Sequence, residues 1–151
     1  MEVDIMYNVN DYSLGDYKAL DELYKKAANL SCKPDPNKFP RYKAGDYIDK
    51  NKSVNWNEEE VARRNQAYKD EVARLNRIRN KAVVEVEDLI RALIVEDIKY
   101  SVKNKSDAWY TNAAKIIYSS AYDRSHAYGV YDILSTVEEY CSMITDIVDF
   151  K

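Results

Sequence analysis

Between Asn57 and Lys103 the chain contains neither glycine nor proline. Because these two residue types interrupt α-helices most strongly, the stretch predicts a single helix of roughly 45 residues, about 70 Å long at 1.5 Å per residue. A helix of that length exceeds the diameter of a small domain. The sequence therefore predicts an all-α protein built around one long helix.

The apolar residues of this stretch follow the helical repeat. At about 100° per residue, one stripe of the predicted helix carries Val61, Tyr68, Val72, Leu75, Ala82, Val86, Leu89, Ile90 and Leu93. From Val83 to Ile98 apolar residues spread over most of the circumference, which is typical of a helix covered on several sides. We expect this second half to be the centre of a helical bundle.

A shorter helix and an irregular arm precede the long helix. Residues 14–31 have apolar positions at three-and-four spacing and predict an amphipathic helix that begins near Ser13. All three prolines and one glycine fall in the following polar stretch, which no helix can cross. This arm is functional, packed as an extended strap, or disordered. Asn55 or Asn57, just before three glutamates, is expected to cap the long helix.

A turn and a return arm complete the predicted architecture. Residues 103–107 ("KNKSD") form the turn, where Asn104 can end one helix and Ser106 or Asp107 can cap the next. At 151 residues we expect one domain, residues 1–151, with an N-terminal helix region at 1–32, an arm at 33–56 and a long antiparallel helical hairpin at 57–149.

The apolar face of the return arm changes sides by roughly 160° within residues 123–129, "DRSHAYG". A kink or break there, with Gly129 as a hinge or helix end, would turn both halves toward one core. The alternative is an unbroken helix that packs on two neighbours in turn. We favour the kink or break.

The same segment holds His126, the only histidine of the chain. Ser125 cannot be its nucleophilic partner, because adjacent helical residues point about 100° apart. We expect His126 to make a structural hydrogen bond. If the hairpin turns near Lys105, residues at equal distances from the turn face one another. This register predicts a structural polar cluster midway along the hairpin, made of Arg79, Asp123, His126 and Asp132.

The charge is unevenly distributed along the chain. Residues 62–81 carry seven Lys or Arg and two acids, a net charge of +5, whereas residues 107–151 have a net charge of -4. The candidate partner-binding residues are the cations Arg63, Arg74, Arg77 and Lys81, together with Tyr42 and Tyr47 of the arm. Over a phosphate-binding stripe we favour a solvated helix back, or one that pairs with the acidic C-terminal helix or with another subunit. The half-exposed stripe at residues 61–75 predicts a homodimer or a higher oligomer.

Several classes of protein have no sequence signal. The two cysteines lie far apart and no Glu-x-x-His pair occurs, so we expect no catalytic residue, no cofactor, no metal and no disulfide. No nucleotide-binding or nucleophile-elbow motif is present. The apolar runs are too short to span a bilayer, and the N-terminus is acidic where a signal peptide would be basic. We therefore expect no membrane partner and a cytoplasmic location.

Residues 121–133, "AYDRSHAYGVYDI", resemble a pattern found in small, uncharacterised proteins of tailed bacteriophages. The matching positions are Ala121, Tyr122, Asp123, His126, Gly129, Asp132 and Ile133, whereas Ser125 and Ala127 replace a glycine and a serine of that pattern. The resemblance implies a phage origin and assigns no functional residue. Together with the absent catalytic motifs and the segregated charge, it leads us to expect a non-enzymatic accessory protein that binds a protein partner, for example one that inhibits a host or anti-phage defence factor. The alternatives are a virion or assembly component that oligomerises through its long helices, and a nucleic-acid-binding helical module, which is not favoured.

Overall fold

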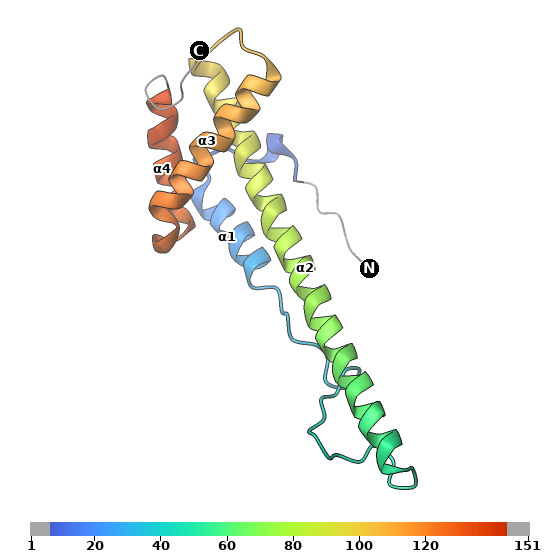
Figure 1. The fold of residues 1–151 in the computed structure, drawn as a ribbon. Coiled ribbons are helices and arrows are strands. Elements are labelled where there is room, and N and C mark those ends of the chain that lie inside the picture. The colour runs from blue at the N-terminus through green and yellow to red at the C-terminus, as the bar shows by residue number, and fades with distance from the viewer. Residues whose placement is uncertain (1–6, 145–151) are drawn as a thin grey trace. The chain divides into compact units, whose positions relative to one another are not determined.

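A computed structural model of the chain describes residues 7–144 and is all-helical over that range (Figure 1). Its α-helices are α1 (Tyr17–Ala28), α2 (Val54–Ser101), α3 (Asp107–Ser125) and α4 (Val130–Ser142), with short 3₁₀ helices η1 (Val9–Asp11) and η2 (His126–Tyr128). The prediction of an all-α fold is thus confirmed for the described residues. The ends of the predicted N-terminal region (residues 1–6) and of the predicted hairpin (residues 145–149) lie outside them.

The chain divides into two compact units with opposite net charge. The acidic unit comprises residues 1–28 and 82–151, and the basic unit comprises residues 29–81. The acidic unit carries 10 Lys or Arg and 18 Asp or Glu, a formal charge of -8, and the basic unit carries 13 and 8, a formal charge of +5. That residues 1–151 act as one domain stays a prediction.

Helix α2 has 48 residues and takes part in both units. Its existence confirms the long helix expected from the absence of glycine and proline. Its start corrects the expected cap, because the Ser53 hydroxyl accepts a hydrogen bond from the Trp56 backbone N–H at 3.0 Å. Asn57, one of the two expected caps, lies inside the helix and holds the arm instead. A serine hydroxyl satisfies an unpaired N–H of the first turn as well as an asparagine does, so the sequence alone did not decide between them.

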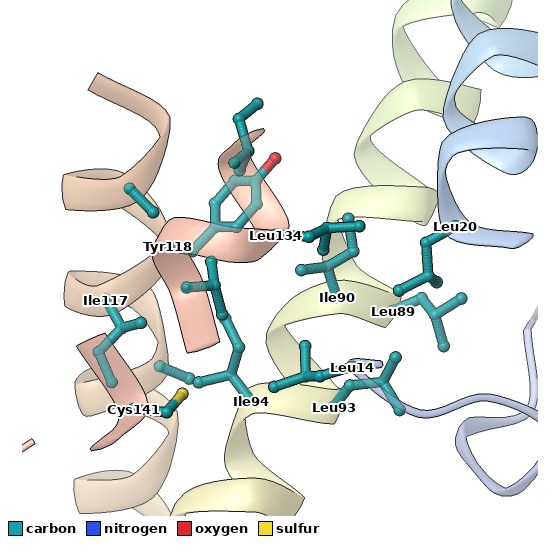
Figure 2. Close-up of a cluster of buried hydrophobic side chains, with 14 of the residues drawn as sticks. Leu14, Leu20, Leu89, Ile90, Leu93, Ile94, Ile117, Tyr118, Leu134 and Cys141 are labelled. Atoms are coloured by element: carbon teal, nitrogen blue, oxygen red, sulfur yellow. The ribbon is translucent and has the colours of Figure 1, made fainter. Parts of the chain in front are cut away.

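The core of the acidic unit is built on the second half of α2, as expected. Val86, Leu89, Ile90, Leu93, Ile94 and Ile98 are all buried. They pack against Leu14 and Leu20 near α1, and against apolar side chains of α3 and α4 (Figure 2). The broad apolar circumference of this half therefore reflects neighbours on several sides.

Two tyrosine–carboxylate hydrogen bonds tie helices of the acidic unit together. The Tyr118 hydroxyl of α3 donates to Glu87 of α2 at 2.8 Å, and the Tyr17 hydroxyl of α1 donates to Glu138 of α4 at 2.6 Å. Burial, reinforced by the neighbouring carboxylate, raises the pKa of Tyr118, and burial with the Glu138 hydrogen bond raises the pKa of Tyr17 to about 12. Both phenols therefore stay protonated donors at neutral pH.

The turn between α2 and α3 uses the residues expected for it. Asn104 adopts a left-handed conformation with a φ of 62°, and the Ser106 side chain caps α3 by accepting from the Trp109 backbone N–H. The Tyr110 hydroxyl then donates to the Val102 carbonyl at 2.8 Å. This bond satisfies a carbonyl at the end of α2.

The return arm consists of two helices that meet at residues 126–129. Helix α3 ends at Ser125, η2 follows, and Gly129 begins α4 with a φ of 104° and a ψ of 178°. Helix α4 packs against α3 and against α1. Because Thr136 donates its single hydroxyl hydrogen to the Asp132 carbonyl, the buried Ser125 hydroxyl is the donor in the 2.7 Å contact with Thr136. The detailed pairing of the predicted hairpin stays a prediction.

Replacing Gly129 by alanine tests how much this junction depends on glycine. The φ and ψ of Gly129 lie where only glycine is at ease, whereas a Cβ atom placed there meets no atom within 4 Å. We expect a loss of about 1–3 kcal/mol in the free energy of unfolding of the acidic unit, caused by backbone strain alone. Gly15→Ala is the matched control, since its Cβ would make only ordinary contacts near 3.9 Å. Equal stability of the two variants in urea unfolding would show that the backbone at residue 129 does not require glycine.

Candidate partner-binding surface

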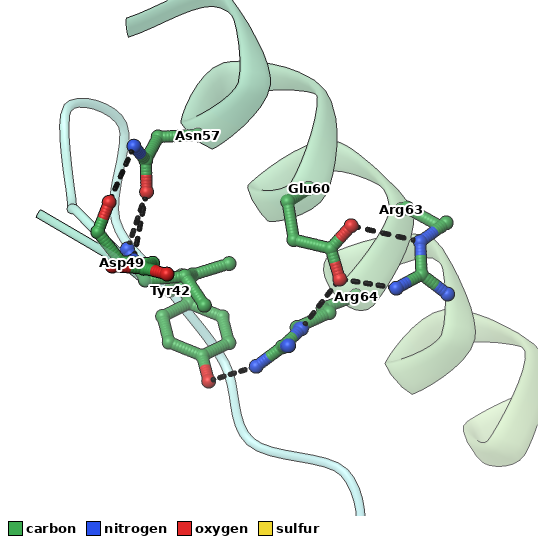
Figure 3. A network of polar contacts seen from close by, with 7 residues as sticks. Tyr42, Asp49, Asn57, Glu60, Arg63 and Arg64 are labelled. Carbon is green, nitrogen blue, oxygen red and sulfur yellow. Dashed lines mark hydrogen bonds and ion pairs between the residues drawn. The ribbon is translucent and has the colours of Figure 1, made fainter. Parts of the chain in front are cut away.

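Asn57 holds the end of the arm against the first turns of α2 (Figure 3). Its side chain is buried, with the residue 2% exposed, and its oxygen accepts hydrogen bonds from the backbone N–H groups of Ile48 and Asp49 at 2.7 and 3.0 Å. Its amide nitrogen donates to the carbonyls of Asp49, Lys52 and Ser53. One side chain thus fixes residues 48–53 and leaves none of its own polar atoms unsatisfied.

A second asparagine holds the middle of the arm. The Asn65 side chain accepts from the Tyr42 backbone N–H and donates to the Tyr42 carbonyl, both at 2.9 Å. The Arg64 guanidinium donates to the Tyr42 hydroxyl at 3.1 Å and to Glu60 at 2.9 Å. Arg41, from the same stretch, places its guanidinium 4.9 Å from the centre of the Tyr68 ring. Among the alternatives for the arm, the structure favours a packed strap.

The strap shields one side of the first half of α2. Val61 is buried and Tyr68, Val72 and Leu75 are half-buried, although the sequence left this stripe without a cover. The homodimer or higher oligomer expected from this stripe stays a prediction. The opposite face stays exposed and carries the four predicted cations, namely Arg63, Arg74, Arg77 and Lys81. We call these four residues the basic face.

Two of these cations are partly neutralised within α2 itself. Arg63 forms an ion pair with Glu60, and Arg74 forms one with Glu71 at 2.5 Å. Hydrogen bonds from Arg63 and Arg64 lower the pKa of Glu60, and a hydrogen bond from Arg74 lowers the pKa of Glu71, so both carboxylates are charged at neutral pH. A surface that binds a nucleic-acid backbone gains affinity by neutralising phosphates with its cations. Pairing within α2 therefore lowers the charge that this face could offer to phosphates.

The two predicted arm tyrosines have different surroundings. Tyr42 is half-buried and occupied by Arg64 and Asn65, so it holds the strap in place. Tyr47 is 53% exposed and directly follows a turn that is closed between Lys43 and Asp46 and has Gly45 at a φ of 88°. An exposed ring on a fixed turn offers contact area at low entropic cost. Tyr47 is therefore the arm residue that is open to a partner, together with Val54, which is 54% exposed and escaped the sequence analysis.

The predicted polar cluster does not form among its members in the acidic unit. His126 is exposed, its ring stacks on Tyr122 at 4.8 Å, and its Nδ1–H donates to the Tyr122 carbonyl at 2.7 Å. Over residues 7–144 no hydrogen bond or ion pair joins Asp123, His126 and Asp132 to one another. The prediction assumed one straight return helix, whereas η2 interrupts the chain between Asp123 and Asp132. Arg79 belongs to the basic unit, and its part in the cluster stays a prediction.

Possible metal ligands and thiols are dispersed over the described residues. Among them no group of three or more His, Cys, Asp or Glu is placed to hold a metal ion. Burial, with Asp97 nearby, raises the pKa of the Cys141 thiol to about 12, so this thiol is protonated at neutral pH. Neither cysteine forms a disulfide in the structure. No helix within the described range combines the length and apolar character that crossing a bilayer requires.

Comparison with known proteins adds no family to these observations. No protein-family model, no curated protein and no solved structure matches the chain. The exposed basic face and the strap beside it are therefore interpreted from their own chemistry.

Proposed function

We propose that this chain is a non-enzymatic, phage-type accessory protein that binds a protein partner, a host or anti-phage defence factor, and inhibits it. The observation that carries the proposal is the basic face of α2. Apolar residues on one side of the helix are buried or half-buried, whereas Arg63, Arg74, Arg77 and Lys81 are exposed on the other side. A charged, solvated face on a rigid helix suits rapid and specific recognition of an oppositely charged protein surface.

The strap offers a second contact, on the side of α2 away from the basic face. Tyr47 and Val54 are exposed beside residues that Asn57 fixes, so binding there costs little ordering of the chain. Aromatic residues are enriched in protein interfaces. The antiparallel hairpin predicted for residues 57–149 and the phage origin implied by residues 121–133 belong to this proposal.

Affinity capture with the purified chain tests the proposal. Tagged protein is incubated with bacterial lysate, and the retained proteins are compared with those retained by Arg77→Glu/Lys81→Glu. We expect an acidic protein to be enriched by the unchanged chain and reduced at least about tenfold by the double variant, because reversed charges repel the partner. Lys26→Glu, an exposed change on α1, is the control and should capture normally.

Two results would overturn this function. Equal capture by the unchanged chain and the double variant would remove the basic face from the interaction. Turnover of a nucleotide or an ester by the purified protein, abolished by His126→Ala, would show an enzyme instead.

A further inference from the structure

The acidic unit has an exposed helix face whose charge is opposite to that of the basic face. Helix α4 contains no Lys or Arg. Asp132, Ser135 and Glu139 are exposed and lie within an arc of about 60° on this helix. Buried Ile133, Leu134 and Val137 occupy its other side. We call Asp132, Ser135 and Glu139 the acidic face.

The charges of the two faces have the same spacing along their helices. Asp132 and Glu139 are seven residues apart on α4, and Arg74 and Lys81 are seven residues apart on α2. At 1.5 Å per residue both separations are about 10 Å. Arg77 lies between Arg74 and Lys81 on the same arc, so a helix laid alongside can bring carboxylates and cations together at two levels at once.

The neighbouring charges define where such a contact would be centred. On α4, Glu138 accepts the Tyr17 hydrogen bond, and the Arg124 guanidinium lies near Tyr140 and Glu139. On α2, Asp70 shares the side of the basic face and accepts from Gln66. Because Asp70 lies one turn before Arg74, the repulsion that it would exert on an acidic helix favours contact over Arg74 to Lys81 rather than nearer the start of α2. The formal charges of -8 and +5 on the two units also favour attraction between the acidic unit of one copy and the basic unit of another.

We propose that the basic face of one copy binds the acidic face of a second copy, so that the protein associates head to tail. This inference rests on the proposed function in one respect, because it assigns a partner to the same basic face. When each contact joins two different faces, the assembly continues as an open chain unless it closes as a ring or as a reciprocal pair of copies. Self-association therefore increases with concentration, and a second copy competes with any other protein for the basic face.

Sedimentation equilibrium of the purified full chain tests the inference. Exposed ion pairs are individually weak and are screened by salt. At 50 mM salt the average mass is expected to rise with protein concentration above that of the monomer. At 500 mM salt the apparent dissociation constant is expected to weaken at least about tenfold, because the Debye length falls below 5 Å.

Two neutral double variants separate a specific contact from general charge attraction. Arg77→Gln/Lys81→Gln keeps only the acidic face intact, and Asp132→Asn/Glu139→Gln keeps only the basic face intact. Each is expected to be monomeric alone, whereas their equimolar mixture should form a 1:1 dimer that does not grow. Glu22→Gln/Lys26→Gln on α1 is the matched control and should associate like the unchanged chain, and circular dichroism verifies that all variants are helical.

A monomer at every concentration, self-association that survives either neutral variant, or a mixture that stays monomeric would each overturn the inference. These outcomes are distinguishable from failure of the proposed function. A monomeric chain that still captures an acidic protein would overturn the self-association but not the proposed function. A self-associating chain that captures no protein would overturn the proposed function but not the self-association.

Discussion

Replacing Ile117 by alanine is expected to lower the free energy of unfolding of the acidic unit by about 3 kcal/mol. Ile117 lies in the middle of α3, is 0% exposed, and belongs to the core formed with α2 and α4 (Figure 2). Alanine removes three buried carbon atoms and leaves a cavity that rigid neighbouring helices fill only in part. Hydrogen exchange of α3 and α4 peptides at increasing urea concentration measures the loss within this unit.

The preceding residue provides the control for this prediction. Ile116 has the same side chain, the same helix and nearly the same sequence position, but is 38% exposed. Ile116→Ala should cost less than about 1 kcal/mol in the free energy of unfolding, because this side chain already contacts water and its removal loses little buried apolar surface. Equal losses for the two variants would mean that α3 is rotated relative to the packing described above.

Asn57→Ala is expected to release the end of the strap and to cost the basic unit about 2–3 kcal/mol. The change removes five hydrogen bonds from backbone groups of residues 48–53. Water replaces some of these bonds, which limits the loss, but the buried groups near Asn57 pay a desolvation penalty. Hydrogen exchange of peptides covering residues 41–53 should accelerate strongly, with little change in α3 and α4.

Two further variants define the role of Asn57. Asn57→Asp keeps the shape and both acceptor functions but loses the N–H donors and sets a negative charge against three carbonyl oxygens, so it should also free the strap. Asn55→Ala changes an exposed asparagine in the same helical turn and should leave exchange unchanged. Unaltered protection of residues 48–53 in both Asn57 variants would show that the strap is held by other contacts.

The features that the sequence predicted well are those that leave a periodic or compositional trace. The absence of glycine and proline predicted α2, and the apolar repeat predicted that Val86, Leu89, Ile90 and Leu93 would be buried. The exposed basic face followed from the same repeat, because a helix that buries one side must expose the other.

The features that the sequence did not predict depend on contacts between side chains and backbone. Asn57 and Asn65 bind whatever residues the arm presents, so neither leaves a repeating pattern. The polar cluster was inferred from equal distances along two straight helices. That assumption fails where η2 and Gly129 turn the chain, after which α4 packs on α3 and α1.

The contacts of the two units differ in sequence separation, so they can form at different times during synthesis of the chain. Every partner of Asn57 in the strap lies within nine residues of it, so the strap contact can form as soon as this part of the chain leaves the ribosome. The acidic unit instead joins α1 to α4, and the hydrogen bond from Tyr17 to Glu138 spans 121 residues. At 5–20 residues per second, α1 therefore waits roughly 6–25 seconds for its partner helix. During that interval the apolar side of α1, centred on Leu20, has no α4 to cover it, and such transiently exposed apolar surface promotes aggregation.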